Sequence, residues 1–72
     1  HDNRIGDFVH LSPGCALGGA VRVGNGTHIG IGATIRNGID IGSDCVVGAG
    51  AVVVKNIPSA GTYIGVPARR MG

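Results

Sequence analysis

The sequence predicts an all-β fold, a parallel β-helix shaped as a triangular prism, and three regularities lead to this prediction. An aliphatic residue recurs at every sixth position from Ile5 to Val53. The residue after it is glycine in six of nine hexads. The residue three positions after it is Gly, Asp or Asn in eight of ten cases, counted from Asp2. Neither an α-helix nor an ordinary strand repeats every six residues, whereas hexapeptide repeats are typical of β-helices.

Each hexad supplies one short strand and one turn. Its fifth and first residues flank a single residue, so both point to the same side of the strand, which is the interior. Its third and fourth residues form the turn, where Gly, Asp and Asn tolerate left-handed backbone conformations. Three strands and three turns close one coil of 18 residues, and successive coils stack about 4.8 Å apart. About three coils fill residues 5–58, and residues 1–4 finish the coil before.

Residues 18 positions apart should therefore lie on top of one another in columns. The sixth positions give three outward columns: His10–His28–Val46, Ala16–Thr34–Val52 and Arg4–Arg22–Asp40. The third positions mark the three corners: His1–Gly19–Asn37–Lys55, Asp7–Asn25–Ser43 and Pro13–Ile31–Ala49. The column that begins at Ala16 is apolar, and we expect it to face protein.

Pro58 ends the repeat and divides the chain in two. Residues 1–58 are predicted to form the hexapeptide-repeat β-helix, and residues 59–72 a short C-terminal tail. Both ends of such a stack expose unpaired strand edges. We expect the tail to cover one end, and an N-terminal domain that this chain lacks to cover the other.

Composition narrows the functional classes. The chain has 72 residues, Phe8 and Tyr63 are its only aromatic residues, and its formal net charge is +2 with scattered basic residues. Nothing resembles a nucleic-acid-binding stripe, a polybasic membrane anchor or a membrane span. Cys15 and Cys45 lack metal spacing and fall at inward positions on different sides of the prism, so we expect free thiols in a reducing cytoplasm.

His1 and Asp2 are the first candidates for chemistry, because both fall on a turn at a prism corner. A neutral imidazole is well suited to accept a proton near neutral pH, and a neighbouring carboxylate can orient it. From the residues alone, a polar turn is the more ordinary interpretation of a His-Asp pair.

His10 and His28 should stack on one outer face, which raises the question of a metal. A zinc site needs three or four ligands. His1 would be a third ligand only if a neighbouring chain supplied it. We predict no metal site, and from the residues alone His28 is an exposed rung of the column.

The hexads, together with VGAGAVVVKNIP and YIGVPARRM, resemble the left-handed β-helix acyltransferases. The opening HDNRIGDFVHLSPGCALGG is similar to the sialic-acid O-acetyltransferase family, which includes bacterial nucleotide-sugar 4-amino N-acetyltransferases. The resemblance implies left-handed coiling, whereas the general rule for crossovers favours the right hand. It also implies homotrimers with active sites between neighbouring β-helices, and an N-terminal αβ domain, absent here, that holds the nucleotide sugar.

The resemblance assigns roles to particular residues. The family's catalytic His-acid pair maps onto His1 and Asp2, which makes His1 the general base. His10 matches a position that contacts acetyl-CoA and could also meet the reacting amine. Ile31 and Ala49 match further acetyl-CoA contacts at a corner flanked by glycines, where exposed backbone groups would suit the amides of the pantetheine arm.

The tail segment GVPARR resembles the family's loop that closes over coenzyme A. Arg69 or Arg70 could pair with its phosphates, and a solvated basic terminus is an equally ordinary interpretation. The cofactor-binding residues that we predict are His10, Ile31, Ala49 and Arg69.

The resulting hypothesis is a cytoplasmic homotrimeric acetyltransferase that moves an acetyl group from acetyl-CoA to the amino group of a nucleotide-linked amino sugar. One alternative is O-acetylation of a sialic acid or another sugar hydroxyl. A second, from a different class, is a structural β-helix without catalysis. A zinc-dependent hydratase is the third. No nucleic acid or membrane partner is expected.

Overall fold

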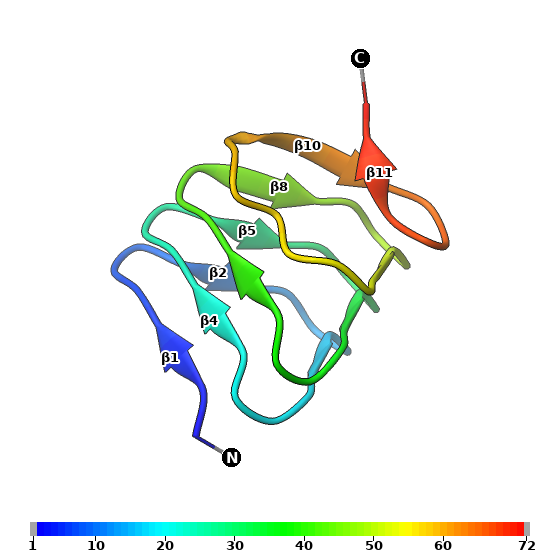
Figure 1. Ribbon diagram of the computed structural model, residues 1–72. Coiled ribbons are helices and arrows are strands. Elements are labelled where there is room, and N and C mark those ends of the chain that lie inside the picture. The colour runs from blue at the N-terminus through cyan, green and yellow to red at the C-terminus, as the bar shows by residue number, and fades with distance from the viewer. Residues whose placement is uncertain (1, 72) are drawn as a thin grey trace.

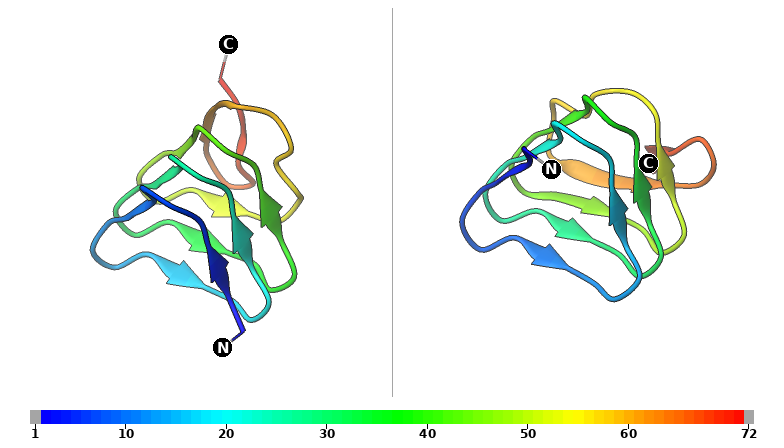
Figure 2. Two further views of the ribbon diagram at one scale, coloured as in Figure 1. Left: turned by 90° about the vertical axis from the view of Figure 1, so that its left-hand side faces the viewer. Right: turned by 90° about the horizontal axis from the view of Figure 1, so that it is seen from below.

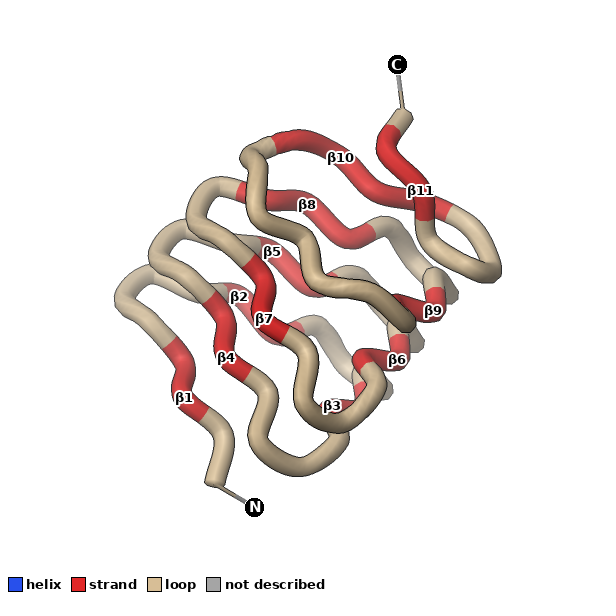
Figure 3. Tube along the Cα trace, viewed as in Figure 1, coloured by secondary structure: helices blue, strands red, loops and turns tan. Residues whose placement is uncertain are grey.

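The computed structural model describes residues 2–71 and is a left-handed parallel β-helix (Figure 1). Each side of the prism carries strands of two or three residues, separated by turns at the corners (Figures 2 and 3). The coil strands are β1 (Arg4–Ile5), β2 (His10–Leu11), β3 (Ala16–Leu17), β4 (Arg22–Val23), β5 (His28–Ile29), β6 (Thr34–Ile35), β7 (Asp40–Ile41), β8 (Cys45–Val47) and β9 (Val52–Val53). Two further strands follow, β10 (Gly61–Ile64) and β11 (Arg69–Arg70).

The strands form three sheets, one for each side of the prism. The first sheet has the order β1-β4-β7, the second β11-β10-β8-β5-β2, and the third β3-β6-β9. Neighbouring coil strands are parallel, and residues 18 apart are partners, as in Arg4↔Arg22, His10↔His28 and Ala16↔Thr34. The predicted fold class is confirmed, and so are the three predicted outward columns, Arg4–Arg22–Asp40, His10–His28–Val46 and Ala16–Thr34–Val52.

The core is a stack of aliphatic side chains along the axis of the prism. Val23, Ile29, Ile35 and Ile41 are all at most 3% exposed. Ile5 lies in register with Val23 but is 41% exposed, because within residues 2–71 no coil lies on its other side. Burial of first- and fifth-position residues against the coils above and below is therefore the main apolar contribution to stability.

The corners need a left-handed backbone, and the fourth residue of the hexad adopts it. Five glycines have positive φ there: Gly14, Gly26, Gly32, Gly38 and Gly50. Three residues with side chains do the same, namely Phe8 (φ 58°), Ala20 (φ 56°) and Asp44 (φ 56°). The predicted turn position is confirmed from Phe8 to Gly50, and Phe8 is the bulkiest residue in it, whereas Asn56, predicted at the same position, has no positive φ.

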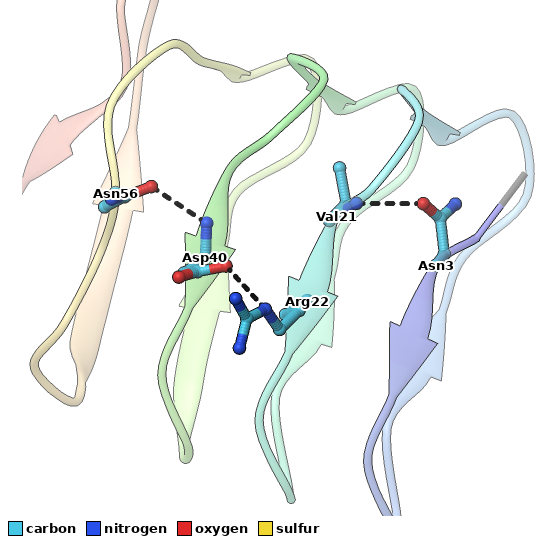
Figure 4. A network of polar contacts seen from close by, with 5 residues as sticks. All are labelled: Asn3, Val21, Arg22, Asp40 and Asn56. Carbon is cyan, nitrogen blue, oxygen red and sulfur yellow. Dashed lines mark hydrogen bonds and ion pairs between the residues drawn. The ribbon is translucent and has the colours of Figure 1, made fainter.

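Polar side chains continue the hydrogen-bonded ladder where the backbone bends. Asn3 Oδ1 accepts the Val21 N–H at 2.9 Å, and Asn56 Oδ1 accepts the Asp40 N–H at 2.9 Å (Figure 4). Arg22 Nε lies 3.3 Å from Asp40 Oδ1 in the same view. This ion pair is exposed, so it is worth at most about 1 kcal/mol.

The first part of the C-terminal tail extends the second sheet. β10 pairs in parallel with β8, and the partners Gly61↔Cys45 are 16 residues apart rather than 18. The bridge Ile41↔Ile57 has the same offset, so the turn after Val53 is two residues shorter than the others. β11 then returns antiparallel along β10.

Cys15 and Cys45 are free thiols, as expected from their different sides of the prism.

Within residues 2–71 the structure contains no helix long and apolar enough to cross a membrane.

Candidate functional site

A groove runs along the outer surface of the second sheet to the corner that follows it. Its volume is about 470 Å³, within the range of roughly 300–1,000 Å³ that is typical of small-molecule sites. The lining residues are His10, Ser12, Pro13, His28, Gly30, Ile31, Val46, Val47, Gly48 and Ala49. Three of the four predicted cofactor residues, His10, Ile31 and Ala49, therefore lie together.

The hexad register explains why these residues meet. His10, His28 and Val46 are outward rungs of β2, β5 and β8, and Pro13, Ile31 and Ala49 follow at the adjoining corner. Ile31 is 63% exposed and Val46 42% exposed. Clustered apolar exposure of this kind marks a contact surface for a ligand or a protein.

Backbone carbonyls at the corner are already engaged in the ladder. Pro13 O accepts the Gly32 N–H at 3.2 Å, and Ile31 O accepts the Gly50 N–H at 2.8 Å. A carbonyl oxygen has a second lone pair. The corner can therefore accept one further hydrogen bond at each of these oxygens.

The two groove histidines are stacked, as their column predicts. Their ring centroids are 4.6 Å apart and their planes differ by 24°. His28 Nε2 also lies 3.2 Å from Ser12 Oγ. Within residues 2–71 no cluster of three or more His, Cys, Asp or Glu side chains is suited to hold a metal.

Ser12 belongs to the groove but was missed by the sequence analysis. It occupies the second position of its hexad, where six of nine hexads have glycine. Gly30 and Gly48 stand in the same column one and two coils on, and both also line the groove. Serine in place of the usual glycine was the feature of the sequence that could have identified Ser12. Only the structure shows that its hydroxyl reaches His28.

Strand pairing separates the two tail arginines. Arg69 pairs with Ile64 and Arg70 with Tyr63. Paired residues of antiparallel strands point to the same side of a sheet. Ile64 packs over Gly48 of the groove, whereas Tyr63 packs against the core. Arg69 thus lies on the groove side of the second sheet, and Arg70 on the other side.

The loop between β10 and β11 lies at the same corner as the groove. Gly65 O accepts the Val52 N–H at 3.1 Å, which holds the start of this loop beside the last coil. Val66, which follows, is 72% exposed. Figure 1 shows the loop projecting beyond the edge of the prism.

Of the predicted catalytic pair, only Asp2 belongs to the described residues, and it does not line the groove. His1 falls outside the described residues. Asp2 is exposed and lines a depression of about 350 Å³ with Arg4, Ala20 and Arg22, none of which lines the groove. A single chain therefore keeps the Asp2 corner and the groove apart.

The sequence pattern of the family described as bacterial transferase hexapeptide (six repeats) matches residues 20–55, which is half of the chain. The chain is a member of the bacterial transferase hexapeptide family.

Solved structures similar to this hexapeptide-family chain are acetyltransferases. PerB from Caulobacter crescentus, solved in complex with CoA and GDP-perosamine, is 47% identical with a TM-score of 0.98 over 100% of this chain. The acetyltransferase domain of PglB from Neisseria gonorrhoeae FA1090, in complex with acetyl coenzyme A, is 44% identical with a TM-score of 0.96 over 99% of this chain. A maltose O-acetyltransferase from Clostridium difficile 630 is 33% identical with a TM-score of 0.91 over 96%.

The hexapeptide-family chain covers only part of these proteins. It spans 35% of the PerB chain, 35% of the PglB domain chain and 46% of the maltose O-acetyltransferase chain. Among curated protein sequences, no significant match was found.

Proposed function

We propose that this chain is the β-helix of an acetyl-CoA-dependent acetyltransferase, and that its acceptor is the amino group of a nucleotide-linked amino sugar. The observation that carries the proposal is the groove that gathers His10, Ile31 and Ala49. It lies on a fold shared with PerB, which was solved with CoA and GDP-perosamine, and with PglB, which was solved with acetyl coenzyme A. The free thiols Cys15 and Cys45 suit a reducing cytoplasm.

The groove supplies the contacts that the pantetheine arm of coenzyme A needs. Ile31 and Val46 provide apolar walls, and the corner carbonyls of Pro13 and Ile31 each retain one lone pair for an amide N–H. Arg69, on the groove side of the second sheet, is placed to pair with phosphate oxygens. His10 lies at the end of the groove nearest the acceptor in this proposal.

The proposed reaction is a direct acetyl transfer. His1, held by Asp2, accepts a proton from the acceptor amine as its nitrogen attacks the thioester carbonyl carbon. The new C–N bond forms, the C–S bond breaks, and the sulfur leaves with the bonding electron pair. Much of the acceleration would come from holding the two reactants in alignment.

This mechanism needs a second copy of the chain. Asp2 and the groove lie on different edges of one prism, with no lining residue in common. In a homotrimer around a threefold axis, the His1–Asp2 corner of one chain can face the groove of the next. We therefore propose that the active site lies between chains.

O-acetylation of a sugar hydroxyl is the second candidate, favoured by the match to a maltose O-acetyltransferase at 33% identity. The same base would serve a hydroxyl. Assays with paired acceptors that differ only in an amine or a hydroxyl, in the presence of acetyl-CoA, distinguish the two.

The proposal is tested by titrating the chain with coenzyme A in a calorimeter. Ile31→Asp places a carboxylate in the apolar groove and should weaken binding about tenfold or more, or about 1.4 kcal/mol. Thr34→Asp introduces the same charge at an exposed position of the third sheet, outside the groove, and should leave affinity within about twofold. A wild-type chain that shows no saturable binding, or equal losses in both variants, contradicts the proposed function.

A further inference from the structure

The side chain of Ser12 is nearly buried, yet it reaches the surface histidine column. Ser12 is 6% exposed, and its Oγ lies 3.2 Å from His28 Nε2. A buried hydroxyl without a partner is destabilising. Every buried side-chain N or O atom within residues 2–71 has a hydrogen-bond partner. The hydrogen bond between Ser12 and His28 therefore holds the exposed His28 imidazole against a nearly buried side chain.

His28 in turn is held from both sides along its column. Its ring stacks on that of His10 with a centroid distance of 4.6 Å, and Val46 is its strand partner on the other side. His10 has a strand neighbour on one side only, because β2 is the edge strand of the second sheet as described. Within the described residues, His28 is the ring against which the exposed His10 imidazole packs.

We propose that Ser12 and His28 are positioning residues for His10, a role that rests on the proposed function of the groove. Ser12 fixes the plane of the His28 imidazole through the Oγ–Nε2 hydrogen bond. The stacked His28 ring then restricts the side-chain rotamer of His10, so that its ring nitrogens face the groove before a ligand binds. An ordered contact residue loses less side-chain freedom on binding than a mobile one.

Three variants separate the hydrogen bond from the stack. Ser12→Ala removes the hydroxyl alone. His28→Phe keeps an aromatic ring for His10 to stack on but loses the nitrogen that meets Ser12. His28→Ala removes both contacts. Thr34→Ala is the matched control, because Thr34 is an exposed sixth-position residue of the same coil on the third sheet.

The first readout is the order of the His10 ring in the ligand-free chain, measured by ¹³C relaxation of labelled histidine. We expect His28→Ala to lower the order parameter of His10 clearly and Ser12→Ala to lower it in part, while His28→Phe and Thr34→Ala leave it near the wild-type value. If Ser12→Ala does not fold, Ser12→Gly restores the residue that six other hexads use. An unchanged His10 order parameter in His28→Ala overturns the proposal.

The second readout is the affinity for coenzyme A of the same variants. His28→Ala should weaken binding about tenfold, Ser12→Ala about threefold, and Thr34→Ala by less than about twofold. Affinity losses in His28→Ala that match those in Thr34→Ala also overturn the positioning role. A wild-type chain that does not bind coenzyme A contradicts the proposed function instead, and the relaxation data still decide whether Ser12 and His28 order His10.

Discussion

At the scale of single residues, burial decides the chemistry of the two cysteines. Cys45 is 0% exposed, and its sulfur lies 3.4 Å from Ser59 O and 3.5 Å from Ser43 O. Burial raises the pKa of the Cys45 thiol above its usual value of 9.0, although the neighbouring Thr27 hydroxyl works in the opposite direction. Cys15 is only half-buried, near the exposed N-terminal coil.

The raised pKa of Cys45 makes stability depend on pH. In the unfolded chain the thiol ionises near pH 9.0, whereas in the folded chain it stays protonated to higher pH. The stabilising contribution is therefore complete below about pH 9 and is lost as pH rises through the folded pKa, at up to about 1.4 kcal/mol per pH unit. Urea unfolding of the wild type and of Cys45→Ala at about pH 7 and pH 10 measures this loss.

Cys15→Ala is the control for the pH prediction. It should keep the decrease in unfolding free energy between the two pH values, whereas Cys45→Ala should reduce it. Equal decreases in the wild type and in Cys45→Ala would show that the Cys45 thiol does not contribute.

At the scale of the hexad element, two kinds of glycine serve different needs. Fourth-position glycines supply positive φ at the corners, as described above. Second-position glycines permit close approach of coils: a Cβ at Gly18 would meet the backbone nitrogen of Asn37, and would lie 2.7 Å from its Cα and 2.9 Å from its Cβ. Gly19, the next residue, has open space around its Cβ position and no positive φ.

These neighbouring glycines give a matched test. Gly18→Ala should lower the unfolding free energy by about 1–3 kcal/mol, since the coils must separate to admit the methyl group. Gly19→Ala should change it by less than about 0.5 kcal/mol, or raise it slightly by restricting the unfolded chain. Denaturant unfolding of both variants compares them, and similar losses would mean that coil contact is not the reason for glycine at Gly18.

The period of six determined most elements of the fold, because each strand stacks on the strand 18 residues before it. His10, Ile31 and Ala49 could be grouped in advance for that reason. The offset of 18 residues ends at the turn after Val53, which is two residues shorter than the other turns. No residue type in this turn indicates that it is shorter. The position of β10, and with it the side on which Arg69 lies, depends on this shorter turn and could not be predicted from spacing.

At the scale of the whole molecule, one edge of the prism carries an exposed aromatic side chain on a backbone in the left-handed conformation. Phe8 has φ 58° and is 95% exposed. A left-handed conformation costs about 1–2 kcal/mol for a residue with a Cβ. The edge joins the first sheet, which starts beside Asp2, to the second sheet, which carries the groove.

The proposed trimer explains this edge. The His1–Asp2 corner of one chain must approach the groove of the next, so the first sheet faces the second sheet of its neighbour. This arrangement leaves the third sheet, which carries the Ala16–Thr34–Val52 column, outside the interface, contrary to the expectation from its apolar residues. The edge at Pro13, Ile31 and Ala49 has to stay open for the ligand. In the proposed trimer the remaining edge points to the threefold axis, and we expect three copies of Phe8 to meet there and bury their rings.

Phe8→Gly should therefore have opposite effects on the single chain and on the assembly. Relief of about 1–2 kcal/mol of strain offsets the extra unfolded-state freedom of glycine, about 0.5–1 kcal/mol, so the isolated chain should be at least as stable. The association constant should fall by about tenfold or more, because burial of each ring contributes about 1.5–3 kcal/mol. Sedimentation equilibrium measures the assembly, and unfolding in dilute solution measures the chain. Asp44→Gly relieves the same kind of strain two coils along the same edge (φ 56°) but removes no aromatic ring, so its association constant should not fall as that of Phe8→Gly does. If both variants assemble alike, or if the wild-type chain sediments as a monomer, Phe8 does not lie at a threefold axis.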